Sequence, residues 1–379
     1  MTIQPHDFSS LSPPVWRAST VVFKTLEDFV TRKSRLPDGF TYGTTGTPTQ
    51  RTLEARIAKL DSAQHCVVLP SGQAAVCIAL LALVKAGDHL LMSESAYGPA
   101  KTFALRSLKN LGVEIELYDP CIGANIASLL RSNTQCIWLE SPGSMTMEVQ
   151  DIPAICAVAK SRNIYTVIDN TWASSLGLKP LDLGVDMTVQ ACTKYMGGHS
   201  DVLMGSVTTH DPSLYAQVRQ LQAGMGQAVN AEDCFLISRG LDTMALRLQA
   251  QSRSTLQVAQ YLASHPAVAE VLYPPLAQSQ GHALWKRDFC GAGTLLSVAL
   301  QNAPFAAYQA MFAAFKHFAI GASWGGVHSI AAYYPADEFI TRKYMPCEGP
   351  LVRLSIGLEG ADAIIEELDT ALQIFQTTL

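Results

Sequence analysis

The chain has 379 residues, of which 48% are hydrophobic and 16% are charged, and its formal net charge at pH 7 is −5. This composition is enough for a sizeable apolar core and excludes an intrinsically disordered protein. The small negative charge gives no basic surface for nucleic acid or for an anionic membrane, so we expect neither as a partner.

Residues 1–46 contain no long periodic run, and we predict an N-terminal arm that packs on another part of the assembly. From Thr52 onwards, short apolar segments alternate with stretches of helical spacing, which is typical of a mostly parallel sheet with helices on both faces. Gly87 is expected to end a helix that begins at Ala74, and Asp151 is expected to cap a helix of residues 151–163. We predict strands at 66–70, 89–93, 113–118, 135–140, 165–169, 187–191 and 203–209, and helices at 51–60, 74–87, 99–110, 124–131 and 151–163.

The pattern changes around Gly240. A long amphipathic helix is predicted at about 240–264, and the segments 293–300 and 351–358 are expected to be antiparallel strands. A final helix places apolar residues on one face, namely Ile364, Ile365, Leu368, Leu372 and Phe375. We therefore predict a larger domain of residues 47–239 and a smaller α+β domain of residues 240–379.

The sequence also predicts a compartment. The first residues, MTIQPHDFSS, have neither the basic nor the apolar segment of a signal peptide. The longest apolar stretch, AAVCIALLALVKA, is interrupted by Lys85 and is too short to span a bilayer. Nine cysteines without CxxC spacing are typical of reduced thiols in a protein core. We expect a cytoplasmic protein that acts on a small molecule and uses no metal.

Several residues that carry chemistry follow predicted strands, and ligands of open α/β sheets lie beyond the carboxyl ends of the strands. Gly72 and Gln73 follow one strand and open a helix, whose N-terminal N–H groups attract phosphate. Tyr97, Asp169 and Lys194 follow three further strands. Each residue has an ordinary alternative: a turn glycine, a half-buried tyrosine, a capping aspartate and a surface lysine.

Together, these residues match what pyridoxal 5′-phosphate (PLP) requires of a protein. The cofactor needs a phosphate site, an aromatic ring to stack on, a carboxylate for its ring nitrogen and an amine for its aldehyde. Gly72, Tyr97, Asp169 and Lys194 supply this set in chain order. Lys194 would bind PLP covalently and later carry protons, which requires an amine that burial makes easy to deprotonate.

From about Tyr42 to the C-terminus, the chain resembles the Cys/Met-metabolism family of PLP-dependent enzymes, which includes cystathionine lyases and synthases. The resemblance lies in the ordered blocks YGTTGTPT, LPSGQAA, SAYGP, VIDNTW, TKYMGGHSD and LVRLSIGLE. It implies PLP fold type I, in which helices enclose a mostly parallel, seven-stranded sheet and a smaller C-terminal α+β domain follows. It also implies a Schiff base on Lys194, a ring-nitrogen contact to Asp169, stacking by Tyr97, phosphate binding by Tyr42, Gly72, Gln73 and Thr193, and an α-carboxylate site at Arg353.

Three segments resemble the β-lyase branch of this family: ESPGSMTMEVQD at 140–151, YGP at 97–99 and ASWGGVHSI at 322–330. In the last segment, Ser323 and Trp324 are expected beside the substrate. The implied reaction is α,β-elimination of L-cystathionine, an amino-acid thioether, to homocysteine, pyruvate and ammonia. The resemblance implies that Lys194, Tyr97 and Tyr42 are the catalytic residues.

Some positions depart from the family pattern. Many relatives carry arginine two residues after the equivalent of Tyr42, and in the family this pair reaches the PLP phosphate of a neighbouring subunit. Here the position is Thr44, so we expect less positive charge near the phosphate. Action of Tyr42 in a neighbouring site implies a homo-oligomer, which in the family is typically a homotetramer. Further departures, which bear on the phosphate site and on substrate range, are Ala191, Ala322 and His328.

Alternative functions remain open at this point. Within the enzymes, the chain could be a cystathionine γ-lyase or γ-synthase, or a broad cysteine-S-conjugate lyase. A non-catalytic PLP-binding regulatory protein with the same fold is an alternative from another class. A Rossmann dinucleotide enzyme is disfavoured because no GxGxxG motif opens the first strand–helix turn.

Overall fold

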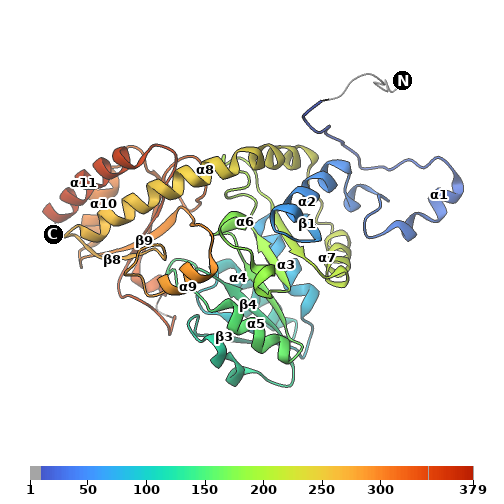
Figure 1. The fold of residues 1–379 in the computed structure, drawn as a ribbon, viewed down its shortest axis with the longest axis horizontal. Coiled ribbons are helices and arrows are strands. Elements are labelled where there is room, and N and C mark those ends of the chain that lie inside the picture. Colours follow the sequence, from blue (N-terminus) through green and yellow to red (C-terminus); the bar gives the residue numbers. More distant parts are fainter. Residues whose placement is uncertain (1–9, 340, 379) are drawn as a thin grey trace.

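A computed structural model describes residues 10–339 and 341–378 of the chain. Its central element is a seven-stranded sheet with the strand order β1-β7-β6-β5-β4-β2-β3 (Figure 1). The pairs from β6 to β3 are parallel, and β7 is antiparallel to both of its neighbours, so the predicted mostly parallel sheet is confirmed. The strands are β1 His65–Leu69, β2 His89–Ser93, β3 Glu114–Tyr118, β4 Thr134–Glu140, β5 Tyr165–Asp169, β6 Met187–Gln190 and β7 Gly205–Thr209.

Helices cover both faces of this sheet because successive strand residues point to opposite faces. In β4, Cys136 and Trp138 belong to the apolar cluster that includes α3 and α7, whereas Ile137 and Leu139 belong to the cluster that includes α5. The helices of this part are α2 Pro48–Leu60, α3 Gly72–Leu83, α4 Gly98–Thr102 with a π-helical continuation Phe103–Leu108, a 3₁₀ helix Gly123–Leu129, α5 Ile152–Ser161, α6 Ser174–Gly177, a 3₁₀ helix Pro180–Leu183, and α7 Pro212–Gly224.

A five-stranded sheet forms the C-terminal part, with the strand order β10-β11-β12-β9-β8. All its pairs are antiparallel except the parallel pair β10–β11, which confirms the predicted change of architecture. The final helix buries four of the five predicted residues, and Ile365 is half-buried. The elements are α8 Ala231–Ser264, β8 Val268–Leu272, α9 His282–Asp288, β9 Leu295–Leu300, α10 Phe305–Ala313, β10 Ala319–Ile320, β11 Ile330–Tyr334, a 3₁₀ helix Ala336–Phe339, β12 Leu351–Ser355 and α11 Ala361–Thr377.

The long helix α8 begins earlier than the sequence predicted. Asn230 caps it by accepting a hydrogen bond from Glu232 N, and the helix continues through Gly240. Gly240 is a point of close approach, because a Cβ there would overlap Met196 O of the loop that follows Lys194. The helix therefore crosses residue 240, and the division into domains at this residue stays a prediction.

Three other predictions need correction, and one is confirmed. α3 ends at Leu83 because Val84 is extended, and Gly87 lies in a turn, where its N–H bonds to Gly112 O. The predicted helix at 124–131 is a 3₁₀ helix, and the one at 99–110 continues from an α-helix into a π-helix. The Asp151 side chain accepts a hydrogen bond from Ala154 N, so the predicted cap of α5 is confirmed.

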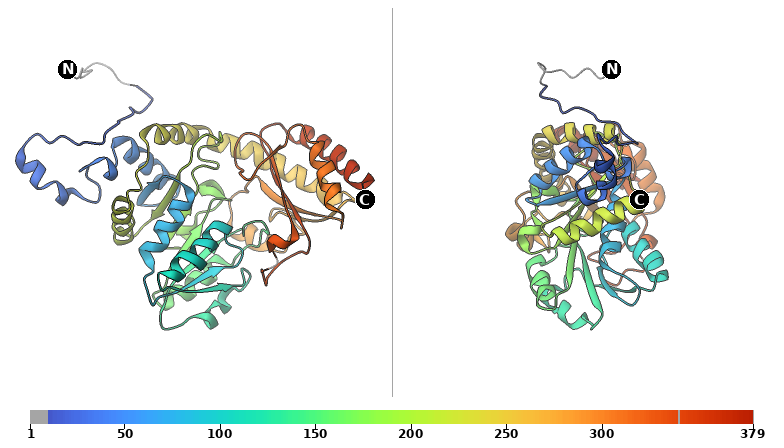
Figure 2. Two further views of the ribbon diagram at one scale, coloured as in Figure 1. Left: turned by 180° about the vertical axis from the view of Figure 1, so that it is seen from behind. Right: turned by 90° about the vertical axis from the view of Figure 1, so that its right-hand side faces the viewer.

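The N-terminal arm runs outside the body of the molecule, at the end opposite to α11 (Figures 1 and 2). Its regular segments are α1 Leu26–Val30 and two 3₁₀ helices, Arg32–Arg35 and Gly43–Thr45. Residues 1–9 of the predicted arm lie outside the described residues. The arm exposes large apolar side chains, including Leu11, Trp16, Val22, Leu26, Phe29 and Val30.

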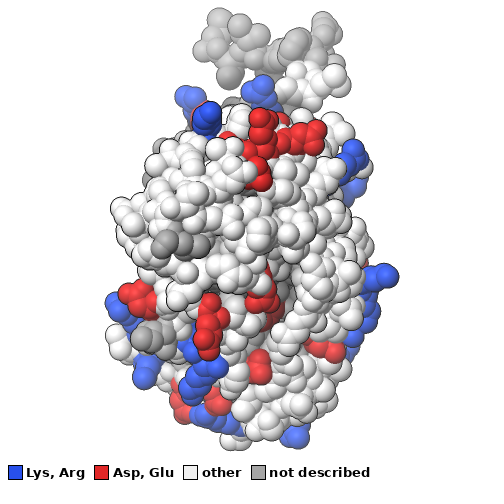
Figure 3. Space-filling view, turned by 90° about the vertical axis from the view of Figure 1, so that its left-hand side faces the viewer, with Lys and Arg blue, Asp and Glu red and all other residues white. Residues whose placement is uncertain are grey.

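The surface and the cysteines bear on the class of protein. No helix in the described ranges is long and apolar enough to cross a membrane, and the same residues contain no cluster suited to a metal ion. Positive and negative side chains are interspersed on the face that carries α10 and α11 (Figure 3). Five of the nine cysteines are buried, whereas Cys121 and Cys290 are exposed, so the prediction of core thiols is right for only part of the set.

One glycine after Lys194 is required by the packing of α8. Gly198 has a φ angle of +74°, which L-residues rarely adopt, and a Cβ there would overlap the guanidinium of Arg247. Arg247 is buried and donates hydrogen bonds to Tyr195 O at 2.9 Å and Gly240 O at 2.8 Å. Gly198 thus allows α8 to pack directly against the Lys194 loop.

Substitution of Gly198 with alanine should therefore destabilise the protein. We expect a cost of about 2 to 5 kcal/mol, from the left-handed backbone conformation and from overpacking against Arg247. Thermal unfolding should show a midpoint several degrees lower. Gly224→Ala is the matched control, because a Cβ at Gly224 meets nothing within 4 Å. Equal midpoints for the two variants would contradict this account.

Candidate active site

A pocket of about 250 Å³ lies at the carboxyl ends of the parallel strands. Loops after β1, β2, β4, β5 and β6 line it, and residues near β9 and β12 close it from the C-terminal part. Parallel strands end at one edge of a sheet, so residues far apart in sequence meet there. Eight predicted site residues line this pocket: Gly72, Gln73, Tyr97, Asp169, Thr193, Lys194, Trp324 and Arg353.

Lys194 extends its amine between the two parts of the chain. Its Nζ donates a hydrogen bond to Ser323 Oγ at 2.9 Å and lies 5.1 Å from the centre of the Trp324 ring. The pKa of Lys194 is lowered to about 8, mainly by burial and also by the positive charge of Arg353, whereas the negative charge of Asp169 opposes both effects. A useful fraction of the amine is therefore neutral near physiological pH.

Asp169 ends β5, and its carboxylate faces the same pocket. The Thr171 N–H, at 2.9 Å, and the Thr171 hydroxyl both donate to its Oδ1, which leaves Oδ2 for a ligand. Burial raises the pKa of Asp169, whereas the Thr171 hydrogen bonds and the charge of Lys194 lower it. A cationic or N–H group of a ligand would favour the ionised carboxylate in the same way.

A candidate anion cradle lies where α3 begins. Ser71 caps this 12-residue helix by accepting a hydrogen bond from Ala74 N at 3.0 Å. A Cβ on Gly72 would come within 2.7 Å of Ala191 Cβ, so glycine lets the loop after β6 approach the helix terminus. The N-terminal N–H groups of α3 and its dipole favour a negatively charged group here.

Thr193 lies beside this cradle, but its hydroxyl is already paired. It accepts from Met204 N at 2.9 Å and donates to Met204 O at 3.2 Å. Binding of a phosphate by Thr193 would require the hydroxyl to turn its proton away from Met204. The predicted phosphate role of Thr193 stays a prediction.

Tyr97 lies at the start of α4, and the residue is 44% exposed. Its backbone N–H donates to Glu140 Oε2 at 2.7 Å. Burial raises the pKa of the Tyr97 phenol, and the charge of Asp169 adds to this. The phenol therefore stays neutral near physiological pH and offers a flat ring with a proton.

Arg353 enters the pocket from the buried strand β12. Its guanidinium donates to Ala322 O, contacts Met145 Sδ at 3.7 Å and lies 5.1 Å from the centre of the Tyr334 ring. None of the ion pairs between described residues includes Arg353. Its charge is available to a carboxylate, whose two oxygens match the planar fork.

The sequence reasoning missed Glu140, which also lines the pocket. Glu140 is the register partner of Asp169 across β4 and β5. Burial raises its pKa well above the usual value, and the charge of Asp169 contributes. The signal was present, because Glu140 ends the apolar run QCIWLE as Asp169 ends YTVID.

Two groups of predicted residues do not line the pocket. Tyr42 is 54% exposed on the arm, and Thr44 lines a separate crevice beside α2. Ser323 contacts the pocket through Lys194 Nζ, whereas His328 is exposed and lies outside the lining set. Within one chain, the structure therefore unites the lysine, aspartate, tyrosine and arginine but leaves Tyr42 apart.

The chain is similar to known proteins in sequence and in structure. The family model described as Cys/Met metabolism PLP-dependent enzyme matches residues 2–373. A putative cystathionine β-lyase of Rhizobium johnstonii is 42% identical over 94% of this chain and 89% of that protein. A cystathionine β-lyase of Escherichia coli is 39% identical over 96% of this chain and 94% of that protein.

The fold is also similar to that of solved structures. A cystathionine γ-synthase from Xanthomonas oryzae pv. oryzae, solved in complex with aminoacrylate and cysteine, superimposes with a TM-score of 0.89. The two sequences are 28% identical, and the match covers 99% of this chain and 96% of that one. These relatives thus include names from both the β- and the γ-acting branches.

The lowered pKa of Lys194 gives a direct prediction. Ligand-free protein should react with an amine-acylating reagent at Lys194 at a rate that rises with pH through a midpoint near 8, because only the neutral amine is nucleophilic. Mass spectrometry of the Lys194 peptide measures this rate. Asp169→Asn removes a charge that raises the pKa and should move the midpoint to lower pH. A midpoint near the ordinary lysine value of 10.5 would contradict the assigned environment.

Proposed function

Because the chain belongs to the Cys/Met metabolism family of PLP-dependent enzymes, we propose that it is a carbon–sulfur β-lyase that converts L-cystathionine and one water to homocysteine, pyruvate and ammonia. The family makes the protein an enzyme with PLP as cofactor, so a non-catalytic regulatory role is set aside. The observation that carries the proposal is the convergence of Lys194, Asp169, Tyr97 and Arg353 on one pocket.

The residues of the pocket fit PLP. The helix terminus at Gly72 and Gln73 suits the phosphate, Asp169 Oδ2 suits the ring nitrogen, and the Tyr97 ring suits stacking. Lys194, whose pKa of about 8 leaves a useful fraction of its amine neutral, suits the covalent link to the aldehyde. When bound, PLP withdraws electrons from the carbon that carries the substrate amino group.

Lys194 is the proton carrier in this proposal. Its Nζ takes the proton from the substrate Cα and later delivers a proton to the sulfur that leaves. The hydrogen bond to Ser323 Oγ holds the amine at the boundary between the two parts of the chain. Arg353 binds the substrate α-carboxylate and thereby orients the Cα–H bond towards Lys194.

The positions of the acidic residues in the pocket favour a β-acting reaction over a γ-acting one. A γ-elimination needs an additional deprotonation at Cβ and a longer proton shuttle. Among the described residues that line the pocket, the acidic ones are Glu140 and Asp169. Glu140 is the last residue of β4 and Asp169 is the last residue of β5, and both strands belong to the large sheet. Position 322, beside Trp324, is an alanine. A γ-lyase, a γ-synthase or a broad cysteine-S-conjugate lyase remains the alternative, because the solved relative named above is a γ-synthase.

We further propose that the enzyme is a homo-oligomer, as a tetramer of two dimers, in the cytoplasm. The exposed apolar arm and the exposed Tyr42 support an arm that packs on a second copy and completes its phosphate site. Leu203 lines the pocket yet is 69% exposed, which is consistent with a rim that a second copy covers. Thr44 brings no charge to that phosphate.

The test of the reaction is product analysis. With L-cystathionine as substrate, we expect pyruvate, ammonia and homocysteine in equal amounts. Pyruvate and 2-oxobutanoate are quantified separately, because the latter forms with cysteine when the γ-bond breaks. Lys194→Ala is the control, and it should lose turnover together with the visible absorbance of lysine-bound PLP. Production of 2-oxobutanoate and cysteine would overturn the β-lyase proposal.

Complementation tests the role of Tyr42 in a neighbouring site. Lys194→Ala and Tyr42→Ala are each expected to have little activity as pure oligomers. A mixed dimer contains one site with both native residues, so co-expression should restore about a quarter of wild-type activity under random pairing. Absence of any recovery, with mixed oligomers present, would place Tyr42 in its own chain's site or outside catalysis.

A further inference from the structure

The turn that carries Tyr42 is held by contacts on both of its flanks. Thr45 Oγ1 donates to Tyr42 O at 2.7 Å and accepts from Thr41 N at 3.0 Å, which closes the turn on itself. Gln222 Nε2 donates to Thr44 O at 3.2 Å, which ties the turn to α7. The backbone around Tyr42 is therefore fixed although the residue is exposed.

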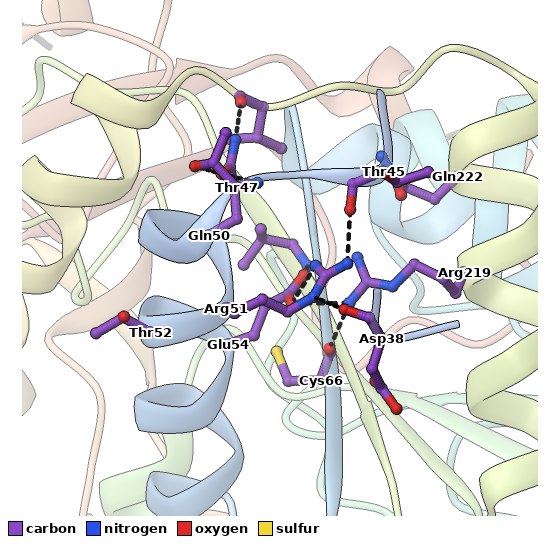
Figure 4. Close-up of polar contacts among 12 residues, drawn as sticks. Asp38, Thr45, Thr47, Gln50, Arg51, Thr52, Glu54, Cys66, Arg219 and Gln222 are labelled. Carbon is purple, nitrogen blue, oxygen red and sulfur yellow. Dashed lines mark hydrogen bonds and ion pairs between the residues drawn. The ribbon is translucent and has the colours of Figure 1, made fainter. Parts of the chain in front are cut away.

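Arg51 of α2 is the residue that clamps this turn from both sides (Figure 4). Its Nη2 donates to Thr45 O at 2.6 Å, three residues after Tyr42. Its Nε donates to Asp38 O at 3.2 Å, four residues before Tyr42. The guanidinium also lies 5.6 Å from the centre of the Phe40 ring. The guanidinium of Arg51 thus connects the chain segments that precede and follow Tyr42.

Glu54 fixes the orientation of that guanidinium. Its Oε2 accepts from Arg51 Nη1 at 2.9 Å and from Arg219 Nη2 at 2.7 Å, and its Oε1 accepts from Val68 N at 3.1 Å. The side chains of Glu54 and Arg219 are each 5% exposed, and that of Arg51 is 18% exposed. A charge network so well shielded from water is costly to rearrange.

The charge network extends from the core to the turn that carries the exposed Tyr42. Here the fixed groups lead from β1 and α7 through Glu54 to Arg51, and from Arg51 to the carbonyls on each side of Tyr42 (Figure 4). The outermost group in this series is the Tyr42 side chain. Rigid support of an exposed side chain lowers the entropy cost of its binding to another surface.

We propose that Arg51 is a positioning residue, which fixes the Tyr42 turn so that Tyr42 can bind the PLP phosphate of a second copy of this chain. This inference rests on the proposed function, in which Tyr42 acts in a neighbouring site. Arg51 acts through backbone carbonyls and does not touch the cofactor. Lysine cannot replace it, because a single ammonium lacks the fork that reaches Asp38 O, Thr45 O and Glu54 together.

The test measures PLP affinity of the full-length holoenzyme by equilibrium dialysis against graded PLP. Tyr42→Phe should weaken binding on the order of tenfold, because it removes a hydrogen bond to a charged group. Arg51→Lys should weaken binding several-fold, and the double variant should bind as Tyr42→Phe does. This lack of additivity is what a residue acting through Tyr42 produces.

Arg56→Lys is the matched control on the same helix. Arg56 donates to Ser238 O at 2.8 Å and pairs with Asp242, and neither partner belongs to the Tyr42 turn. Its PLP affinity should equal that of the wild type. If Arg51→Lys fails to fold, Tyr215→Phe provides a second route, because it removes the 2.6 Å bond from Tyr215 OH to Asp38 Oδ1. It too should weaken PLP binding, and should do so only when Tyr42 is present.

The outcomes separate the two proposals. If Tyr42→Phe weakens PLP binding and neither Arg51→Lys nor Tyr215→Phe does, the positioning role is wrong while the role of Tyr42 in PLP binding stands. If the effects of Arg51→Lys and Tyr42→Phe simply add, Arg51 acts by another route and the inference also fails. If Tyr42→Phe leaves affinity unchanged, the neighbouring-site role of Tyr42 fails and the inference fails with it.

Discussion

The site depends on the burial of one amine, that of Lys194, away from water. Lys194 lies where burial and the charge of Arg353 disfavour its protonated form, and only Asp169 favours it. These three groups come from the loop after β6, from β12 and from the last residue of β5. Their proximity exists only because the parallel strands end at one edge and the C-terminal sheet closes over that edge.

The packing around Lys194 joins the two parts of the chain. The Tyr195 hydroxyl accepts from Thr294 N at 2.8 Å, beside β9, and Trp172 Nε1 donates to Leu295 O at 2.9 Å. Arg247 of α8 binds the carbonyl of Tyr195 and lies against Gly198. The loop that carries the amine is thus held both by the residue that precedes β9 and by the long helix α8.

Much of the fold follows from local pattern, and the exceptions have physical causes. The strands ending in Asp169 and Glu140 are apolar runs that a buried parallel sheet requires, and periodicity reveals them. The sequence predicts the start of α8 near Gly240, too late in the chain, because a glycine that permits helix–loop contact inside a helix resembles a glycine at a helix boundary. The pairing of Thr193 with Met204 and the clamp of Arg51 on the Tyr42 turn depend on tertiary contacts that spacing does not encode. The roles of individual site residues came from chemistry at strand ends and from family resemblance, and they stay predictions.

The measurement that tests the central claim most directly is the location of the cofactor. Holoenzyme reduced with borohydride fixes PLP to the lysine that holds it, and peptide mass spectrometry then identifies that lysine. The account predicts the added mass on the peptide that contains Lys194, with none on other lysines. Attachment to a different lysine, or bound PLP that borohydride does not fix to the chain, would contradict the site described above.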